Sequence, residues 1–264
     1  MEGSESVLPP AVRVDSDVGP LLLPAGDKVI RPGLESNGVW EPEEAAVIRT
    51  LVEPGATVLD VGAHCGYFTL MMSGLVGPGG TVVALEPAPD NHALLRANVE
   101  HSGATNVRVL NAAGWRSSGE RIPLSLSDTN SGDHRSYRWS SGRPFVEVDG
   151  IAIDDLDPAL DRLDLVKLDT QGTEHVVIEG MRSTIERCRP VALTEFWPIS
   201  IRELGDRPED VLALYRGLGF EIAVIEDESV APDASDAELI GLAGASLTEF
   251  VTLVLRPAEA GRPA

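Results

Sequence analysis

The sequence is poor in cysteine, in lysine and in long apolar runs. Cys65 and Cys188 are its only cysteines, which excludes a disulfide framework and a cysteine zinc site. No apolar run reaches the ~18 residues of a membrane-spanning helix. The first residues also lack the basic and apolar parts of a secretion signal. We therefore expect no membrane partner and a cytoplasmic protein.

Positive charge is scarce as well. Lysine occurs only at Lys28 and Lys167, and 21 basic residues stand against 42 acidic ones, giving a formal net charge of −21. A field of that sign repels polyanions, so no nucleic-acid partner is expected. Otherwise the composition is that of an ordinary globular protein, with 43% hydrophobic and 24% charged residues.

Short apolar runs rich in β-branched residues alternate with segments of helical periodicity. This alternation predicts an α/β fold, a doubly wound, mostly parallel sheet of seven strands. The predicted strands are 57–61, 81–85, 106–110, 163–168, 190–196, 220–225 and 250–255. The predicted helices are 43–52, 67–76, 90–102, 173–187 and 207–218.

Three further features complete the predicted organisation. Residues 122–126 and 145–149 alternate in polarity and predict an inserted β-hairpin. Residues 1–25 are expected to form a loose N-terminal arm, with pairing at a sheet edge as the alternative, and 258–264 a frayed tail. Between them, 26–257 are expected to form one domain, with exposed sheet edges that allow a homodimer.

A turn rich in glycine follows the first predicted strand and has an acid before it. It reads Asp60-Val-Gly62-Ala-His64-Cys-Gly66 and leads into a helix, whose free N–H groups favour anionic ligand groups. Glu86 ends the next strand, where a carboxylate can accept hydrogen bonds from two ribose hydroxyls. The pair predicts a site for an adenosine-containing cofactor. Because the G-x-G-x-x-G spacing of dinucleotide sites is absent, NAD is the weaker candidate.

Several motifs together resemble those of the FkbM family of class I S-adenosylmethionine-dependent methyltransferases. They are the segment 58–70, Glu86-Pro87, Lys167-Leu-Asp169-Thr-Gln-Gly172-Thr-Glu174, a late Glu195 and the upstream Gly38-Val-Trp-Glu41. The similarity spans about residues 38 to 198. Two departures are His64, where the family commonly has Asn, and Thr170-Gln171, where it usually has Val-Glu.

The resemblance implies a Rossmann-like fold, S-adenosylmethionine as cofactor and a small-molecule acceptor. Methylation of a hydroxyl on a natural product or sugar is expected, in secondary-metabolite biosynthesis, with an amine, amide or peptide nitrogen as the nearest alternative. The residues implied to bind the cofactor are Glu41, Asp60, Gly62, Ala63, His64, Gly66, Thr69, Glu86, Pro87 and Ala113.

Three acids are the candidates for catalysis. Asp169 ends a predicted strand and is the leading candidate to take up or orient the acceptor proton. Glu174 and Glu195 are the others, although Glu174 also suits a helix N-terminus and Glu195 also suits an ion pair with arginine. No metal is expected, but these three acids are also a possible Mg²⁺ set.

The predicted substrate-binding residues come mainly from the polar loop 127–139. They are Asn130, His134 and Arg135, joined by Lys167, which either holds Asp169 ionised or is only a structural ion-pair partner. The loop is interpreted either as a lid whose arginines, including Arg138 and Arg143, bind the acceptor, or as an ordinary solvated loop. Two other functions remain open: a nicotinamide-dependent oxidoreductase and a non-catalytic cofactor-binding module.

Overall fold

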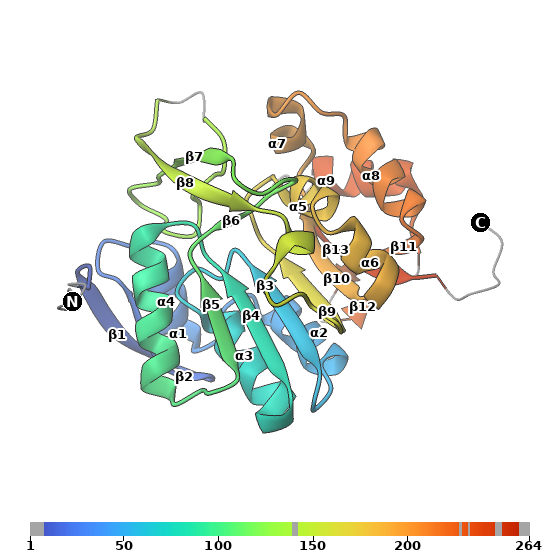
Figure 1. The fold of residues 1–264 in the computed structure, drawn as a ribbon. Helices are drawn as coiled ribbons and strands as arrows, with labels where there is room; N and C mark the ends of the chain where they lie inside the picture. Colours follow the sequence, from blue (N-terminus) through green and yellow to red (C-terminus); the bar gives the residue numbers. More distant parts are fainter. Residues whose placement is uncertain (1–7, 139–141, 227–228, 232, 246–249, 259–264) are drawn as a thin grey trace.

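A twisted sheet with helices on both faces forms the centre of the computed structural model (Figure 1). The structure describes residues 8–138, 142–226, 229–231, 233–245 and 250–258. The sheet order is β12-β11-β13-β10-β9-β3-β4-β5, in which β13 runs antiparallel to β10 and β11. The strands are β3 Thr57–Val61, β4 Thr81–Leu85, β5 Val107–Leu110, β9 Leu165–Leu168, β10 Val191–Phe196, β11 Phe220–Glu226, β12 Ser229–Val230 and β13 Val251–Pro257.

The strand order reverses between β3 and β9. From β3 the chain moves through β4 to β5 in one direction, whereas β9 and β10 extend the sheet in the other. Ligands of such sheets bind beyond the carboxyl ends of the strands at this switch point. The predicted seven-stranded, doubly wound fold is confirmed, and the two-residue β12 adds an eighth strand at the edge.

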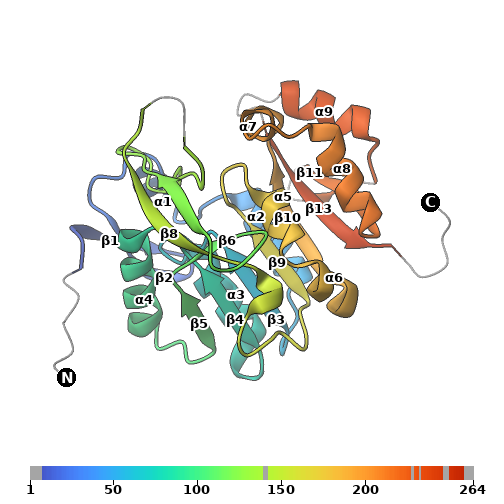
Figure 2. The same cartoon turned by 45° about the horizontal axis from the view of Figure 1, so that its top comes forward.

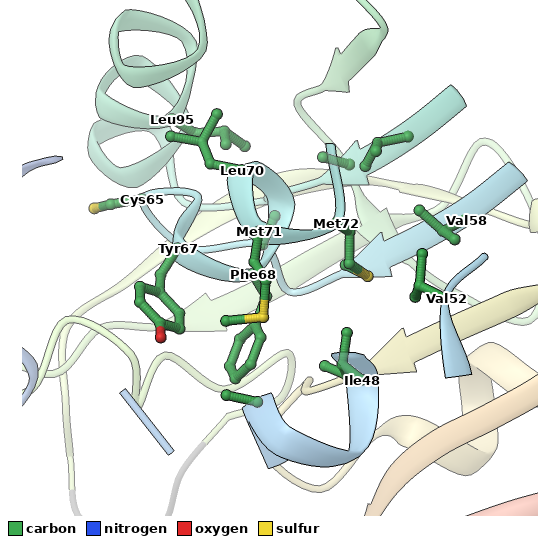
Figure 3. Packing of buried hydrophobic residues seen from close by; sticks show 14 of the residues in the cluster. Ile48, Val52, Val58, Cys65, Tyr67, Phe68, Leu70, Met71, Met72 and Leu95 are labelled. Carbon is green, nitrogen blue, oxygen red and sulfur yellow. The ribbon is translucent and has the colours of Figure 1, made fainter. Parts of the chain in front are cut away.

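The two faces of the sheet bury different sets of helices. Alternate residues of each strand point to opposite faces, so Val58 packs in one core cluster and Leu59 in the other. Figure 3 shows Phe68 and Met72 of one helix packed with Ile48 of another and with Val58. The helices of the chain are α1 Ile30–Asn37, α2 Pro42–Leu51, α3 Tyr67–Val76, α4 Pro89–Ser102, α5 Glu174–Glu179, α6 Arg182–Cys188, α7 Pro198–Glu203, α8 Pro208–Gly217 and α9 Asp236–Ala245, with 3₁₀ turns at Gly77–Gly79 and Ile153–Asp155.

The segment expected to be a loose arm is a packed hairpin instead. Strands β1, Ala11–Ser16, and β2, Gly19–Pro24, pair antiparallel. Leu21 and Leu23 are fully buried, and the side chain of Asn98 in α4 hydrogen-bonds both backbone groups of Leu22. The burial of these leucines makes the hairpin part of the core. Of the expected tail, only Ala258 lies within the described residues.

The helix predicted over 173–187 is two helices. Asp154 lies in a 3₁₀ turn and accepts hydrogen bonds from the backbone N–H groups of Ser183 and Thr184, which caps α6 as a new helix. The chain also passes so close to Trp115 at Gly180 that a Cβ there would lie 2.0 Å from the Trp115 carbonyl oxygen. Both contacts are distant in sequence, so local periodicity carries no sign of the break.

The predicted hairpin insertion is confirmed. Strands β7, Arg121–Ser125, and β8, Phe145–Ile151, pair antiparallel, and the short β6, Ala113–Gly114, pairs with β8 to make a separate three-stranded sheet. This sheet lies on the side of the molecule away from α8 and α9 (Figure 2). No helix among the described residues is long and apolar enough to cross a membrane.

Candidate active site

A cleft opens at the switch point, where the residues after β3, β4 and β9 meet strand β6. The empty space within it, counted together with its open mouth, is about 840 Å³. Ten predicted site residues line it: Asp60, Gly62, Ala63, His64, Glu86, Pro87, Ala113, His134, Lys167 and Asp169. The other predicted residues lie around it without lining it: Glu41, Gly66, Thr69, Asn130, Arg135, Glu174 and Glu195.

Asp60 is the acid of the motif turn and is only 1% exposed. Its Oδ2 accepts a hydrogen bond of 2.5 Å from the Thr69 hydroxyl, which explains why Thr69 matters without lining the cleft. Its Oδ1 is buried and has no hydrogen-bond partner among the described residues. A buried acceptor without a partner costs free energy unless a ligand satisfies it. The residues present therefore fit a cofactor that presents an N–H or O–H group here.

We expect Asp60→Ala to weaken the binding of S-adenosylhomocysteine about ten- to hundredfold, the usual value of a hydrogen bond to a charged group. Isothermal titration calorimetry measures this effect. Asp90→Ala, which removes an exposed acid in the first turn of α4, is the charge-matched control. Equal affinities for the two variants would show that Asp60 does not hold the cofactor.

The two motif glycines are required by protein contacts. Gly66 has φ +95° at the start of α3, and a Cβ there would lie 2.6 Å from Leu95 Cδ1 of α4. Gly62 has φ +87°, and its Cβ would lie 1.9 Å from the carbonyl oxygen of Asp169. The sequence predicts a tight turn at Gly62 and a close approach of a ligand or of the helix start at Gly66. In the structure the close contacts are made by the Asp169 carbonyl and by the Leu95 side chain.

Glu86 lies at the end of β4 and is held by two backbone groups. Its Oε2 accepts the N–H of His64 at 2.8 Å, and its Oε1 accepts the N–H of Ala88 at 2.9 Å. Burial raises the pKa of Glu86 to about 7, although these hydrogen bonds act in the opposite direction. Each oxygen keeps a further lone pair for a ligand hydroxyl.

We expect the affinity for S-adenosylhomocysteine to rise as the pH increases through about 7. Below that value Glu86 is protonated in the free protein, so accepting two ribose hydroxyls first requires losing a proton. This linkage changes the affinity by at most about tenfold per pH unit, and the change levels off above the pKa. Calorimetry across this range tests it. If Glu86→Gln keeps the same pH slope, another group is responsible.

Lys167 and Asp169 form the polar floor of the cleft. The Lys167 Nζ lies 2.9 Å from Asp169 Oδ2, 3.9 Å from Glu44 Oε2 and 4.4 Å from the centre of the Phe68 ring. Burial would lower the pKa of Lys167, but the surrounding carboxylates, Asp169 first, raise it well above its usual range. Lys167 is therefore a buried cation paired with Asp169, a geometry that fits both interpretations of this residue.

Of the three predicted catalytic acids, Asp169 alone lines the cleft. Its side chain is 22% exposed, and Gln171 Nε2 donates to its Oδ1 at 2.8 Å. Glu174 instead accepts the backbone N–H groups of Thr170 and Gly172, at 2.7 and 3.1 Å, and so holds the loop after β9. This role resembles the capping alternative more than direct catalysis. Asp169, Glu174 and Glu195 do not come together as a metal-ligating group among the described residues, so the geometry does not favour the Mg²⁺ alternative.

Two glutamates lie behind Asp169. Glu195 of β10 is 7% exposed, and Gln171 Nε2 lies 3.5 Å from its Oε2. Glu41, which the resemblance implies to bind the cofactor, lines a second hollow together with Glu44 and Thr252. Its Oε2 is buried without a partner among the described residues. Burial and neighbouring carboxylates raise the pKa of both Glu41 and Glu195 well above the usual range.

The arginines of the 127–139 loop are engaged within the protein. Arg135 and Arg143 both pair with Asp133, at 2.8 and 2.7 Å, and Arg135 also stacks on Trp197 with 4.5 Å to the ring centre. Arg138 lies 4.1 Å over the Phe145 ring. Trp139 lies outside the described residues. The idea that these arginines form an acceptor-binding lid is therefore replaced by one in which they fix the loop.

Other loop residues reach the cleft. His134 and its neighbours Ser131, Gly132 and Ser136 line it, while the Asn130 side chain accepts the N–H of Gly132 within the loop. The sequence motifs single out neither Ser131 and Asn91 nor the apolar residues Ile30 and Leu34, which also line the cleft. The polar composition of the loop was the available signal for Ser131. Trp40 lines the cleft as well and lies in the Gly38-Val-Trp-Glu41 element, whereas Ile30 and Leu34 gave no signal because no helix or strand is predicted over their stretch.

Comparison with known proteins agrees with this architecture. The family model described as the methyltransferase FkbM domain matches residues 60–222, more than half of the chain. The protein-L-isoaspartate O-methyltransferase of Methanothrix thermoacetophila is 36% identical over 69 residues, which cover 26% of this chain and 33% of that protein. The match thus spans about a third of the relative's length.

Solved structures are similar at low identity. A methyltransferase FkbM from Methylobacillus flagellatus KT is 17% identical with a TM-score of 0.49, covering 76% of this chain and 44% of that one. TYW2 of M. jannaschii, solved in complex with AdoMet, is 14% identical with a TM-score of 0.46, covering 94% and 85%.

Proposed function

The chain belongs to the FkbM family of methyltransferases, and we propose that it methylates a hydroxyl of a small natural product or of its sugar. Its methyl donor is S-adenosylmethionine, as in its family, so the nicotinamide-dependent oxidoreductase and the non-catalytic module are set aside. The acceptor, and oxygen rather than nitrogen as the methylated atom, belong to the proposal.

One observation carries the choice of a hydroxyl acceptor. Asp169 is a carboxylate at the cleft, fixed by Lys167 on one oxygen and by Gln171 on the other. A neutral hydroxyl must lose its proton when its oxygen is methylated, and a positioned carboxylate is a suitable group to receive that proton. A neutral amine can attack through its lone pair first, so it needs such a group less.

The chain's own residues divide the remaining work. When bound, S-adenosylmethionine supplies an electrophilic methyl group on a sulfonium. Asp60, Glu86 and the N-terminus of α3, which border the cleft, would hold it. Asp169 orients the acceptor hydroxyl, and Glu174 fixes the loop that carries Asp169 by binding its N–H groups. Alignment of the two reactants and exclusion of water then provide most of the rate.

The test is transfer of a labelled methyl group to a panel of compounds. Each compound is offered as a matched set with a free hydroxyl, a free amine or neither, and the methylated atom is identified by NMR. The proposal expects O-methyl product from compounds that carry the hydroxyl. Products methylated only on nitrogen would overturn the choice of hydroxyl while leaving methyl transfer established.

A further inference from the structure

Two segments far apart in sequence close one side of the cofactor cleft. The stretch 27–34 contributes Ile30 and Leu34, and the loop 129–134 contributes Ser131 and Gly132. A Cβ on Gly132 would lie 2.6 Å from Ile30 Cδ1, and the backbone of 28 donates to the carbonyl of 129 at 2.8 Å. We call these two segments the cover.

A buried acid joins the two halves of the cover. Asp27 is 3% exposed, and its Oδ2 accepts both the N–H and the hydroxyl of Ser131, at 2.8 and 2.6 Å. Its Oδ1 accepts the N–H groups of Val29 and Arg31 at the start of α1. Burial would raise the pKa of Asp27, but the hydrogen bonds from Ser131 and the backbone leave it below the usual value. Asp27 is thus a fixed anion.

The same serine connects the cover to the motif turn. Ser131 Oγ lies 2.8 Å from His64 Nε2. The serine hydroxyl has a single proton, which goes to Asp27, so the histidine must donate from Nε2. The backbone N–H of His64 in turn donates to Glu86. His64 therefore links the cover to the motif turn and to Glu86, the acid expected to bind the ribose.

The backbone does not explain why this residue is a histidine. His64 has φ +50°, in the left-handed region, where asparagine is better tolerated than most side chains. What histidine adds is reach, because its Nε2 extends to Ser131 whereas an asparagine amide is shorter. Burial lowers the pKa of His64 to about 4, so the ring is neutral near neutral pH.

We propose that the chain of hydrogen bonds Asp27–Ser131–His64 is a latch that holds the cover closed over the bound cofactor. In this latch His64 is a positioning residue, and it sets how long the cofactor remains bound. The inference concerns the cofactor site alone and goes beyond the proposed acceptor, so it stands or falls independently of which atom is methylated.

Three substitutions of His64 distinguish the effect of its hydrogen bond to Ser131 from the effect of the left-handed backbone at this position. His64→Ala removes the side chain, His64→Asn suits the left-handed backbone but is too short, and His64→Gln carries an N–H donor about as far as Nε2. The rate of S-adenosylhomocysteine release, measured by stopped-flow displacement, is expected to rise about tenfold in the Ala and Asn variants. The Gln variant is expected to stay close to the unchanged protein.

Two further measurements report on the latch without catalysis. Amide hydrogen exchange across 127–134 should speed up in the Ala and Asn variants and not in the Gln variant. Ser131→Ala should also speed release, and adding His64→Ala to it should change little, because Ser131→Ala already removes the hydroxyl that His64 binds. Ser127→Ala, in the same loop, is the control, because its hydroxyl accepts the backbone N–H of 130 and has no other hydrogen bond within the described part of the chain.

Each variant has a result that would overturn the latch. Release from the Asn variant as slow as from the unchanged protein would mean that only backbone fit matters. Release from the Gln variant as fast as from the Ala variant would mean that the donor to Ser131 does not matter. Additive effects of the His64 and Ser131 changes would show two separate contacts. Any of these results overturns the latch.

Discussion

Replacing Asp169 with asparagine is expected to lower kcat about 10²- to 10⁴-fold, the usual range for loss of a general base. Asparagine keeps the size and one acceptor oxygen of the aspartate, but its amide cannot take up the acceptor's proton. The cofactor groups at Asp60 and Glu86 are untouched, so the Kd for S-adenosylhomocysteine should change little. Steady-state kinetics and calorimetry measure the two effects separately.

The control must account for Lys167, which loses a charged partner in that variant. Glu44 also pairs with Lys167, at 3.9 Å, yet it does not line the cleft. Glu44→Gln removes the same charge from the same lysine without removing the proposed proton acceptor. If it slows the reaction as much as Asp169→Asn, with similar melting temperatures, the effect is electrostatic or structural and Asp169 is not the base.

The parts of the site that the sequence predicts are those encoded within one strand and the turn after it. Asp60 lies near the end of β3, Glu86 and Asp169 directly follow β4 and β9, and parallel strands bring such positions to one edge of the sheet. The spacing of Lys167 and Asp169 likewise places both on one face of β9, where they pair. These inferences need only the strand period and the α/β topology.

The parts that the sequence does not predict depend on distant contacts. Asp27 and Ser131 are 104 positions apart, and nothing local marks either as a partner of the other. The hairpin β1–β2 has its leucines between prolines, a composition typical of a loop, and only packing against α4 explains it. The site residues at the ends of the strands can therefore be predicted from the sequence, whereas the contacts between the two segments of the cover cannot.

Gly62→Ala is expected to have the largest effect on stability. The left-handed φ of +87° costs a side chain about 1–3 kcal/mol, and forcing a methyl group into a packed site costs about 1–3 kcal/mol more. The clash is with the Asp169 carbonyl, a backbone atom that cannot rotate away. Total stabilities are about 5–15 kcal/mol, so the loss is a large fraction.

Gly55 allows the two costs to be separated. It has a nearly equal φ of +83°, but nothing lies within 4 Å of a Cβ built there. Gly55→Ala therefore reports the backbone cost alone, and the difference between the two variants in urea denaturation reports the close approach of β3 to β9. If the two variants lose the same free energy of unfolding, the backbone near Asp169 can move away from the added methyl group without an energetic penalty. A larger loss for Gly62→Ala would show that the motif glycine fixes the position of the proposed base, since the same close approach joins the cofactor turn to Asp169.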